Sequence, residues 1–115
     1  MSDTSNKSNR QKVYTLLVQV GRSLEDDLPK SATGAALLCY ASGMDEAEAV
    51  RETVAILKQA ALSPLDVAGY GTREERIAQG HEIDSEEDVL MQRALDENSV
   101  IVAQMNALYG EQADG

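Results

Sequence analysis

The residue best suited to acid–base chemistry in this chain is His81, the only histidine among its 115 residues. Imidazole is the one side chain that ordinarily gains and loses a proton near neutral pH, which makes it a natural general acid or base. His81 is followed directly by Glu82 and preceded by Arg73 and Arg76. We take His81 and Glu82 as candidate catalytic residues, and Arg73 and Arg76 as candidate residues for binding a ligand.

The acidic run at 84–88, Asp-Ser-Glu-Glu-Asp, adds carboxylates to the same connector. Carboxylates bind divalent cations, whereas arginines and helix N-termini favour anions, so the sign of a ligand here stays open. The run lacks the alternating spacing and central glycine of a calcium loop, and a single histidine argues against a histidine-rich site. Acidic residues at a helix start also complement the helix dipole, which is an ordinary structural role. We therefore predict no metal site and no cofactor.

The only cysteine, Cys39, is the second residue with intrinsic reactivity. Its neighbours Leu38 and Tyr40 place it in an apolar strand, where burial raises the pKa of a thiol and suppresses its reactivity. A catalytic pair of Cys39 with His81 stays open, although no flanking sequence indicates one. The ordinary interpretations are that Cys39 fills the core as a small apolar residue and that His81 caps a helix or faces solvent.

Two further candidates for ligand binding are Tyr70 and Arg93. Arg93 lies near the end of a predicted helix, four residues before Glu97, which is also the spacing of an ordinary surface ion pair. A tyrosine joins apolar area to a polar tip, which suits a core, a ligand groove or a dimer interface. All four tyrosines fall in or beside predicted strands: Tyr14, Tyr40, Tyr70 and Tyr109.

The elements that position these residues are clearest between Thr33 and Thr72. An apolar run at 34–41 predicts a buried strand, and apolar residues spaced three and four apart at 47–61 predict one face of a helix, with Asp45 and Glu48 as a capping box. Ser63-Pro64 is expected to end that helix, and 65–70 to form a second strand. The simplest connection of this kind is a right-handed crossover between parallel strands.

The remaining segments complete one domain. Residues 12–21 predict a strand, 72–80 and 85–97 predict helices with starts at Thr72 and Ser85, and 99–109 predict a last strand that is partly helical after Gln104 in an alternative interpretation. The order is strand, strand, helix, strand, helix, strand. We predict an α+β fold with a single four-stranded mixed sheet and helices packed on one face, similar to the ferredoxin-like class in size and element count.

Composition and charge limit the number of domains, the possible partners and the location of the protein. We expect one domain at 12–109, with a disordered lead-in at 1–11 and a disordered tail at 110–115, because both ends are polar. The net charge of −10 opposes binding to nucleic acid and to anionic lipid, so we expect neither partner. The absence of an apolar leader or spanning run, together with the single cysteine, predicts a cytoplasmic protein.

No motif in the sequence defines a reaction, and whether the protein is an enzyme stays open. We expect a non-enzymatic module that forms a homodimer, either through the sheet face that holds Val13 and Leu17 or through the edge of the first strand. The alternative is a small enzyme or ligand-binding protein with a polar site around Arg73, Arg76, His81 and Glu82. A pocket with convergent polar groups beside His81 favours the alternative, and a large apolar interface favours assembly.

Overall fold

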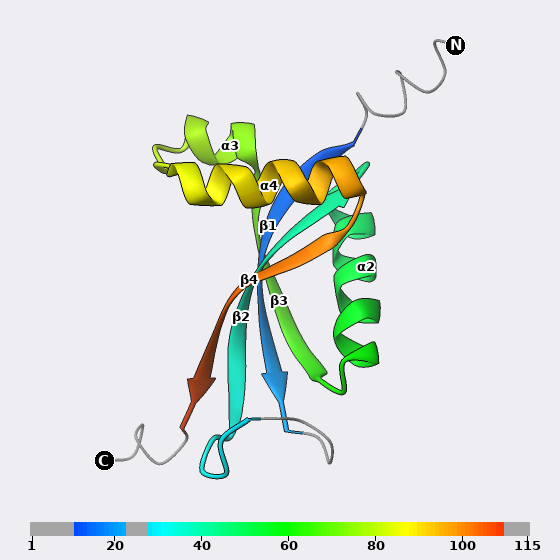
Figure 1. Ribbon diagram of the computed structural model, residues 1–115, viewed down its shortest axis with the longest axis vertical. Helices are drawn as coiled ribbons and strands as arrows, with labels where there is room; N and C mark the ends of the chain where they lie inside the picture. Colours follow the sequence, from blue (N-terminus) through cyan, green and yellow to red (C-terminus); the bar gives the residue numbers. More distant parts are fainter. Residues whose placement is uncertain (1–10, 23–27, 110–115) are drawn as a thin grey trace.

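The computed structural model describes residues 11–22 and 28–109. Apart from Gln11, the predicted disordered ends at 1–11 and 110–115 lie outside the described residues. The chain forms a four-stranded sheet with three helices (Figure 1). In chain order the elements are β1 (Lys12–Gly21), β2 (Gly34–Gly43), α2 (Glu46–Gln59), β3 (Ser63–Thr72), α3 (Arg73–Ala78), α4 (Ser85–Glu97) and β4 (Val100–Leu108).

The sheet is antiparallel throughout, with the strand order β3-β1-β2-β4. The prediction of a mixed sheet was therefore wrong. β2 and β3, which α2 connects, do run parallel to each other, as the predicted crossover requires, but β1 lies between them because it pairs with both. The interior position of β1 also removes the edge through which we expected self-association.

Helices cover both faces of the sheet, not one face as the sequence led us to expect. Leu16 and Val18 of β1 pack in a core with Ala49 and Leu57 of α2. Residues of the opposite face, including Val13 and Tyr40, pack with Met91 and Ala94 of α4. Side chains alternate between the two faces of a strand, so a pair of strands that is apolar on both sides needs a helical layer on each. The likeness to ferredoxin-like sandwiches therefore does not extend to the placement of the helices.

The sheet is strongly twisted, and its strands cross one another in the view of Figure 1. α4 lies across the end of the sheet where β1 begins, whereas α2 runs along its other face. Val13 is buried beneath α4, but Leu17, further along the same face of β1, is only half-buried. The sheet face that we expected to mediate dimerisation is thus closed by α4 at one end.

Local signals explain where the helices begin. The Asp45 side chain accepts a hydrogen bond from the Glu48 backbone at 2.8 Å, and Thr72 and Glu75 form a reciprocal capping box. Both predicted helix starts are confirmed. The third start was misplaced by one residue, because Asp84 and not Ser85 accepts the backbone hydrogen bond of Glu87, at 2.8 Å.

Two element ends differ from the prediction. α2 ends at Gln59, before Ser63-Pro64, since Ala61 adopts a left-handed conformation with φ of 64°. Pro64 instead lies in the edge strand β3, where a missing backbone donor is tolerated. β4 stays extended to Leu108, because pairing with β2 overrides the helical tendency of its Met and Ala residues.

Cys39 has no solvent-exposed surface, and burial raises the pKa of its thiol to about 11. The predicted burial is therefore confirmed. We expect native protein to react with a thiol reagent at least about a thousandfold more slowly than protein in denaturant, because labelling needs an opening that costs a large part of a typical 5–15 kcal/mol stability. Stopped-flow or manual labelling under both conditions measures this ratio. Equal rates would contradict the placement of Cys39 in the core.

Candidate functional site

Arg76 lies at the centre of a polar network between α3, α4 and the sheet. Its Nη1 donates to Thr15 Oγ1 at 3.1 Å, its Nε donates to His81 Nδ1 at 3.1 Å, and its Nη2 is 3.9 Å from Glu87 Oε1. Only 12% of the Arg76 side chain is exposed. A guanidinium suits this position because its fork of donors satisfies several acceptors at once.

Tyr40 extends the network across the sheet. Its hydroxyl donates to Glu87 Oε2 at 2.9 Å, and Tyr40 is the neighbour of Thr15 in the β1–β2 register. Burial, and then the hydrogen bond to Glu87, raise the pKa of Tyr40 to about 12. Tyr40 therefore stays protonated at neutral pH and acts as a hydrogen-bond donor to Glu87.

His81 is held at the rim of this network rather than in a pocket of its own. Its Nδ1 accepts from Arg76, so in this arrangement the neutral ring carries its proton on Nε2. The backbone N–H of His81 also donates to the carbonyl of Arg76 at 2.9 Å, which fixes the connector against the end of α3. With one ring nitrogen occupied and the residue exposed, His81 serves here as a partner of Arg76. Glu82, the second catalytic candidate, is exposed next to it.

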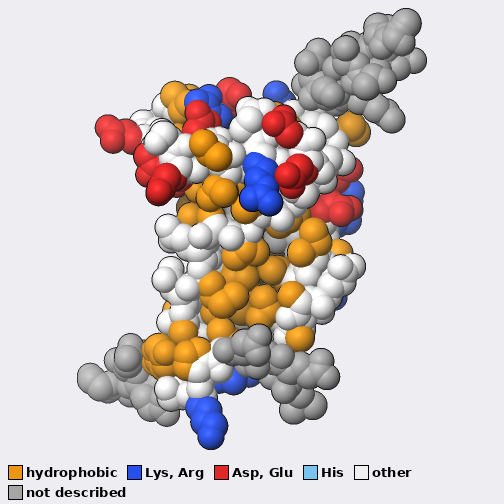
Figure 2. Space-filling model, in the orientation of Figure 1, with side chains coloured by type: hydrophobic (Ala, Val, Ile, Leu, Met, Phe, Trp, Pro, Cys, Tyr) orange, Lys and Arg blue, Asp and Glu red, His pale blue; other side chains and the backbone are white. Residues whose placement is uncertain are grey.

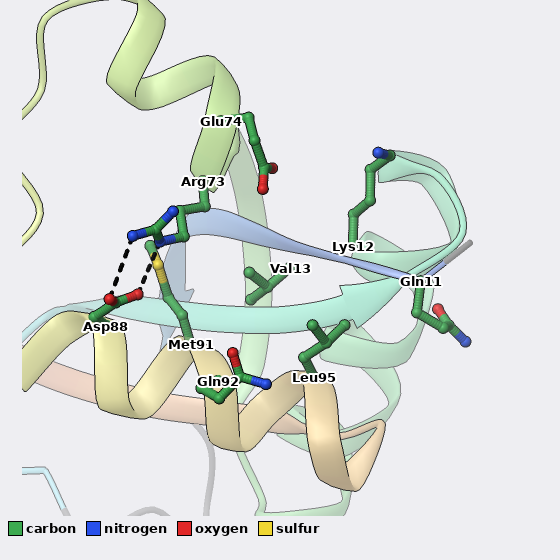
Figure 3. A pocket seen from close by; sticks show the side chains of 9 residues that line it. All are labelled: Gln11, Lys12, Val13, Arg73, Glu74, Asp88, Met91, Gln92 and Leu95. Atoms are coloured by element: carbon green, nitrogen blue, oxygen red, sulfur yellow. Dashed lines mark hydrogen bonds and ion pairs between the residues drawn. The ribbon is translucent and has the colours of Figure 1, made fainter. Parts of the chain in front are cut away.

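Arg73 faces a different part of the surface from Arg76. Its Nε and Nη2 bind the carboxylate of Asp88 at 2.8 and 3.3 Å, and this interaction raises the pKa of Arg73. The pair stands at one side of a cavity of about 330 Å³ between α3, α4 and the start of β1 (Figure 3). Val13, Met91 and Leu95 form its apolar part.

The cavity carries charges of both signs at its rim. Lys12 and Glu74 line it together with the Arg73–Asp88 pair, and neither forms an ion pair within the described residues. Figure 3 shows the two side chains on the same side of the cavity, above the apolar floor. This arrangement can accommodate a small zwitterion with an apolar group, because each of its charged groups finds a counterpart on the rim.

The structure brings together some of the residues that the sequence selected. Arg76 and His81 are in direct contact, whereas Arg73 lies in the neighbouring Arg73–Asp88 pair. Arg93 pairs with Glu97 at 3.3 Å on the surface of α4, as its spacing predicted. Tyr70 is 41% exposed on the edge strand β3.

Sequence reasoning missed three members of the Arg76 network, namely Thr15, Tyr40 and Glu87. The signal for the first two was present, since each is a polar residue within a strand of mainly apolar residues. Glu87 belongs to the acidic run at the predicted start of a helix, and nothing in the sequence indicates its contact with β2.

The fold and the network define the class of protein: an α+β domain with an antiparallel sheet between helical layers, and a polar network beneath one of them. The chain matches over residues 13–109 the family described as Domain of unknown function (DUF8846), and it belongs to that family. Searches with this chain found no match among the curated proteins and none among the solved structures.

Among the described residues, no three histidine, cysteine or acidic side chains are grouped to hold a metal ion. No helix of the described chain has the length and apolar character needed to cross a membrane.

We predict that Arg76→Ala destabilises the protein by about 2–4 kcal/mol, because it leaves Glu87 without its cation and Thr15 without a donor beneath two helices. Arg73→Ala is the matched control, since it removes an arginine from the same helix whose side chain is 38% exposed, and we expect a clearly smaller loss. Urea denaturation followed by circular dichroism gives both free energies. Equal decreases in the free energy of unfolding would show that the Arg76 network stabilises the protein no more than the exposed Arg73–Asp88 pair does.

Proposed function

We propose that this domain is a non-enzymatic assembly module that forms a homodimer through the outer edge of β4. The observation that carries the proposal is the contrast between the two edge strands. β4 has the sequence VIVAQMNAL, nine residues without charge or proline, and only its inner edge pairs with another strand of the described residues. An exposed edge of this kind presents unpaired backbone donors and acceptors that favour pairing with another strand.

The opposite edge, β3, carries the features that discourage such pairing. It contains Pro64 and Asp66, and its pairing with β1 is interrupted at two irregularities. Proline, charge and bulges are the ordinary means by which a sheet edge avoids association. β4 has one irregular position, at Ala103, but neither proline nor charge, and this weaker protection supports a functional role for β4.

Exposed apolar side chains lie on β4 as well. Val102 is 41% exposed and Met105 is 49% exposed, and both lie on the α2 side of the sheet, opposite Cys39 and Leu37. Figure 2 shows hydrophobic side chains gathered over the middle of the molecule, below its charged helical end. Burial of such surface at about 25 cal/mol per Å² adds to the backbone hydrogen bonds of an edge pair.

The charge distribution supports the same approach of two copies. The chain has a net charge of −10, which opposes close contact between copies in most orientations. The four strands hold only two charged residues, Lys12 and Asp66, and neither is in β4. Contact along β4 therefore brings together the part of the surface with the least charge.

The polar network fits this non-enzymatic proposal. Arg76, His81, Glu87 and Tyr40 contact one another, and the cavity that Glu82 lines together with Arg73 does not have His81 among its lining residues. A cytoplasmic location is part of the proposal, because the only cysteine is buried and has no partner for an internal disulfide.

We expect sedimentation of the native protein at micromolar concentration to give about twice the 12.4 kDa mass of one chain. Val102→Lys combined with Met105→Lys should raise the dissociation constant at least about a hundredfold, since unpaired charges at a desolvated edge cost several kcal/mol. The control is Leu65→Lys, which puts a charge in place of a 67% exposed apolar residue on β3 and should leave the dimer intact. A native monomer at these concentrations would refute the proposal.

The second candidate function is the binding of a small zwitterion in the cavity beside Arg73, favoured by Lys12 and Glu74 at its rim, neither of which forms an ion pair with another described residue. Free amino acids and short peptides are the probes. Methyl NMR of the methionines gives an internal control, because Met91 is on the cavity floor while Met44 and Met105 are exposed elsewhere. Binding should shift the Met91 signal alone. Unchanged spectra across these probes would remove this candidate.

A further inference from the structure

β4 presents a definite set of side chains to each face of the sheet. Four residues of β4 face α2: Val100, Val102, Met105 and Ala107. Val100 packs against the core that contains α2, and the other three are paired with residues of β2 that belong to that core. Four other residues of β4 face α4: Ile101, Ala103, Gln104 and Asn106. The first two pack against the core that contains Met91 of α4, and the last two are paired with residues of β2 on the same face of the sheet.

The pattern contains one irregularity, at Ala103. Cys39 pairs with Val102 and Leu38 pairs with Gln104, so Ala103 is an extra residue in β4. Ala103 and Gln104 consequently follow each other on the same side of the sheet, whereas all other neighbours from 100 to 107 alternate. Such a bulge constrains the pairing of any strand added at the outer edge, because opposed residues in a sheet share a face.

From this pattern we infer the register of the dimer: two copies of β4 pair antiparallel about a twofold axis between Ala103 and Gln104. Val102 then lies opposite Met105 of the second copy, Ile101 opposite Asn106, and Val100 opposite Ala107. Every opposed pair from 100 to 107 shares a face, because the bulge of one copy meets the bulge of the other. A shift of one or two positions in either direction breaks this match at the bulge.

The register also explains which surface the second copy covers. It places Val102 and Met105 of both copies in one cluster on the α2 side, where each side chain is about half exposed in the single chain. Ile56 of α2, itself 36% exposed, and Val100 line a hollow next to this cluster, in which Glu48 and Glu52 also take part. The apolar contact of the two copies is therefore that of Val102 with Met105, and cross-strand pairs of this kind stabilise a sheet.

This inference rests on the proposed dimer, and cysteine cross-linking tests it separately. Val102→Cys and Met105→Cys are made as two single variants, one of them carrying a tag that changes its mass. Directly opposed residues of an antiparallel pair have Cα atoms about 4.5–5.5 Å apart, which permits a disulfide, whereas residues three positions out of register are too distant. The native Cys39 stays in place because it is buried.

We expect mild oxidation of the mixed variants to give a covalent dimer that contains one chain of each mass, while each variant alone and the native protein give none. Two results would overturn the register and leave the self-association in place. One is efficient self-linking of Val102→Cys or of Met105→Cys, and the other is the absence of a mixed covalent dimer from chains that sediment as dimers. Native protein that sediments as a monomer would instead refute the assembly on which the register rests.

Discussion

Pairing of β1 with β2 over their whole length is the interaction on which the rest of this structure depends. The two strands match without a break from Lys12 opposite Gly43 to Gly21 opposite Gly34. Both carry apolar side chains on both faces, so the part of the sheet where β1 begins needs cover on each side, whereas Gln19 near the other end of β1 is exposed. Their position at the centre of the sheet, a helical layer on each face, and the placement of β3 and β4 at the edges follow from that requirement.

The second helical layer creates a polar problem that the Arg76 network solves. Thr15 and Tyr40 are neighbours on the face that α3 and α4 cover, and a buried hydroxyl without a partner is costly. Arg76 supplies the donor for Thr15, and Glu87 accepts from Tyr40 while it balances the charge of Arg76. No buried side-chain nitrogen or oxygen of the described residues lacks a partner. The Arg76 network is thus accounted for by the docking of two helices on the sheet.

The parts of the fold that the sequence predicts are those set by neighbouring residues. The strands, the amphipathic helix after Asp45 and the capping box at Thr72 all depend on spacings of a few positions, and they are confirmed. The arrangement of the strands depends on which strands pair. Here β1 pairs with both β2 and β3, so the two parallel strands that α2 connects are not neighbours and every pair in the sheet is antiparallel. The network was predicted only in part, because Arg76 and His81 are five residues apart whereas Thr15 and Arg76 are sixty-one apart.

A sheet whose centre is fixed by one hairpin must have two edges, and this chain treats them differently. β3 is held between two helical connections and contains Pro64, Asp66 and two irregular positions, each of which weakens it as a template for another strand. β4 follows α4 directly and has neither charge nor proline, although charged residues make up 26% of the chain. Solubility alone would favour a charge at such an edge. In the proposed dimer, the acidic residues of the helices oppose other orientations of two copies, whereas contact along β4 brings together strands that carry no charge. The same distribution of charge would then oppose general association and favour one specific contact.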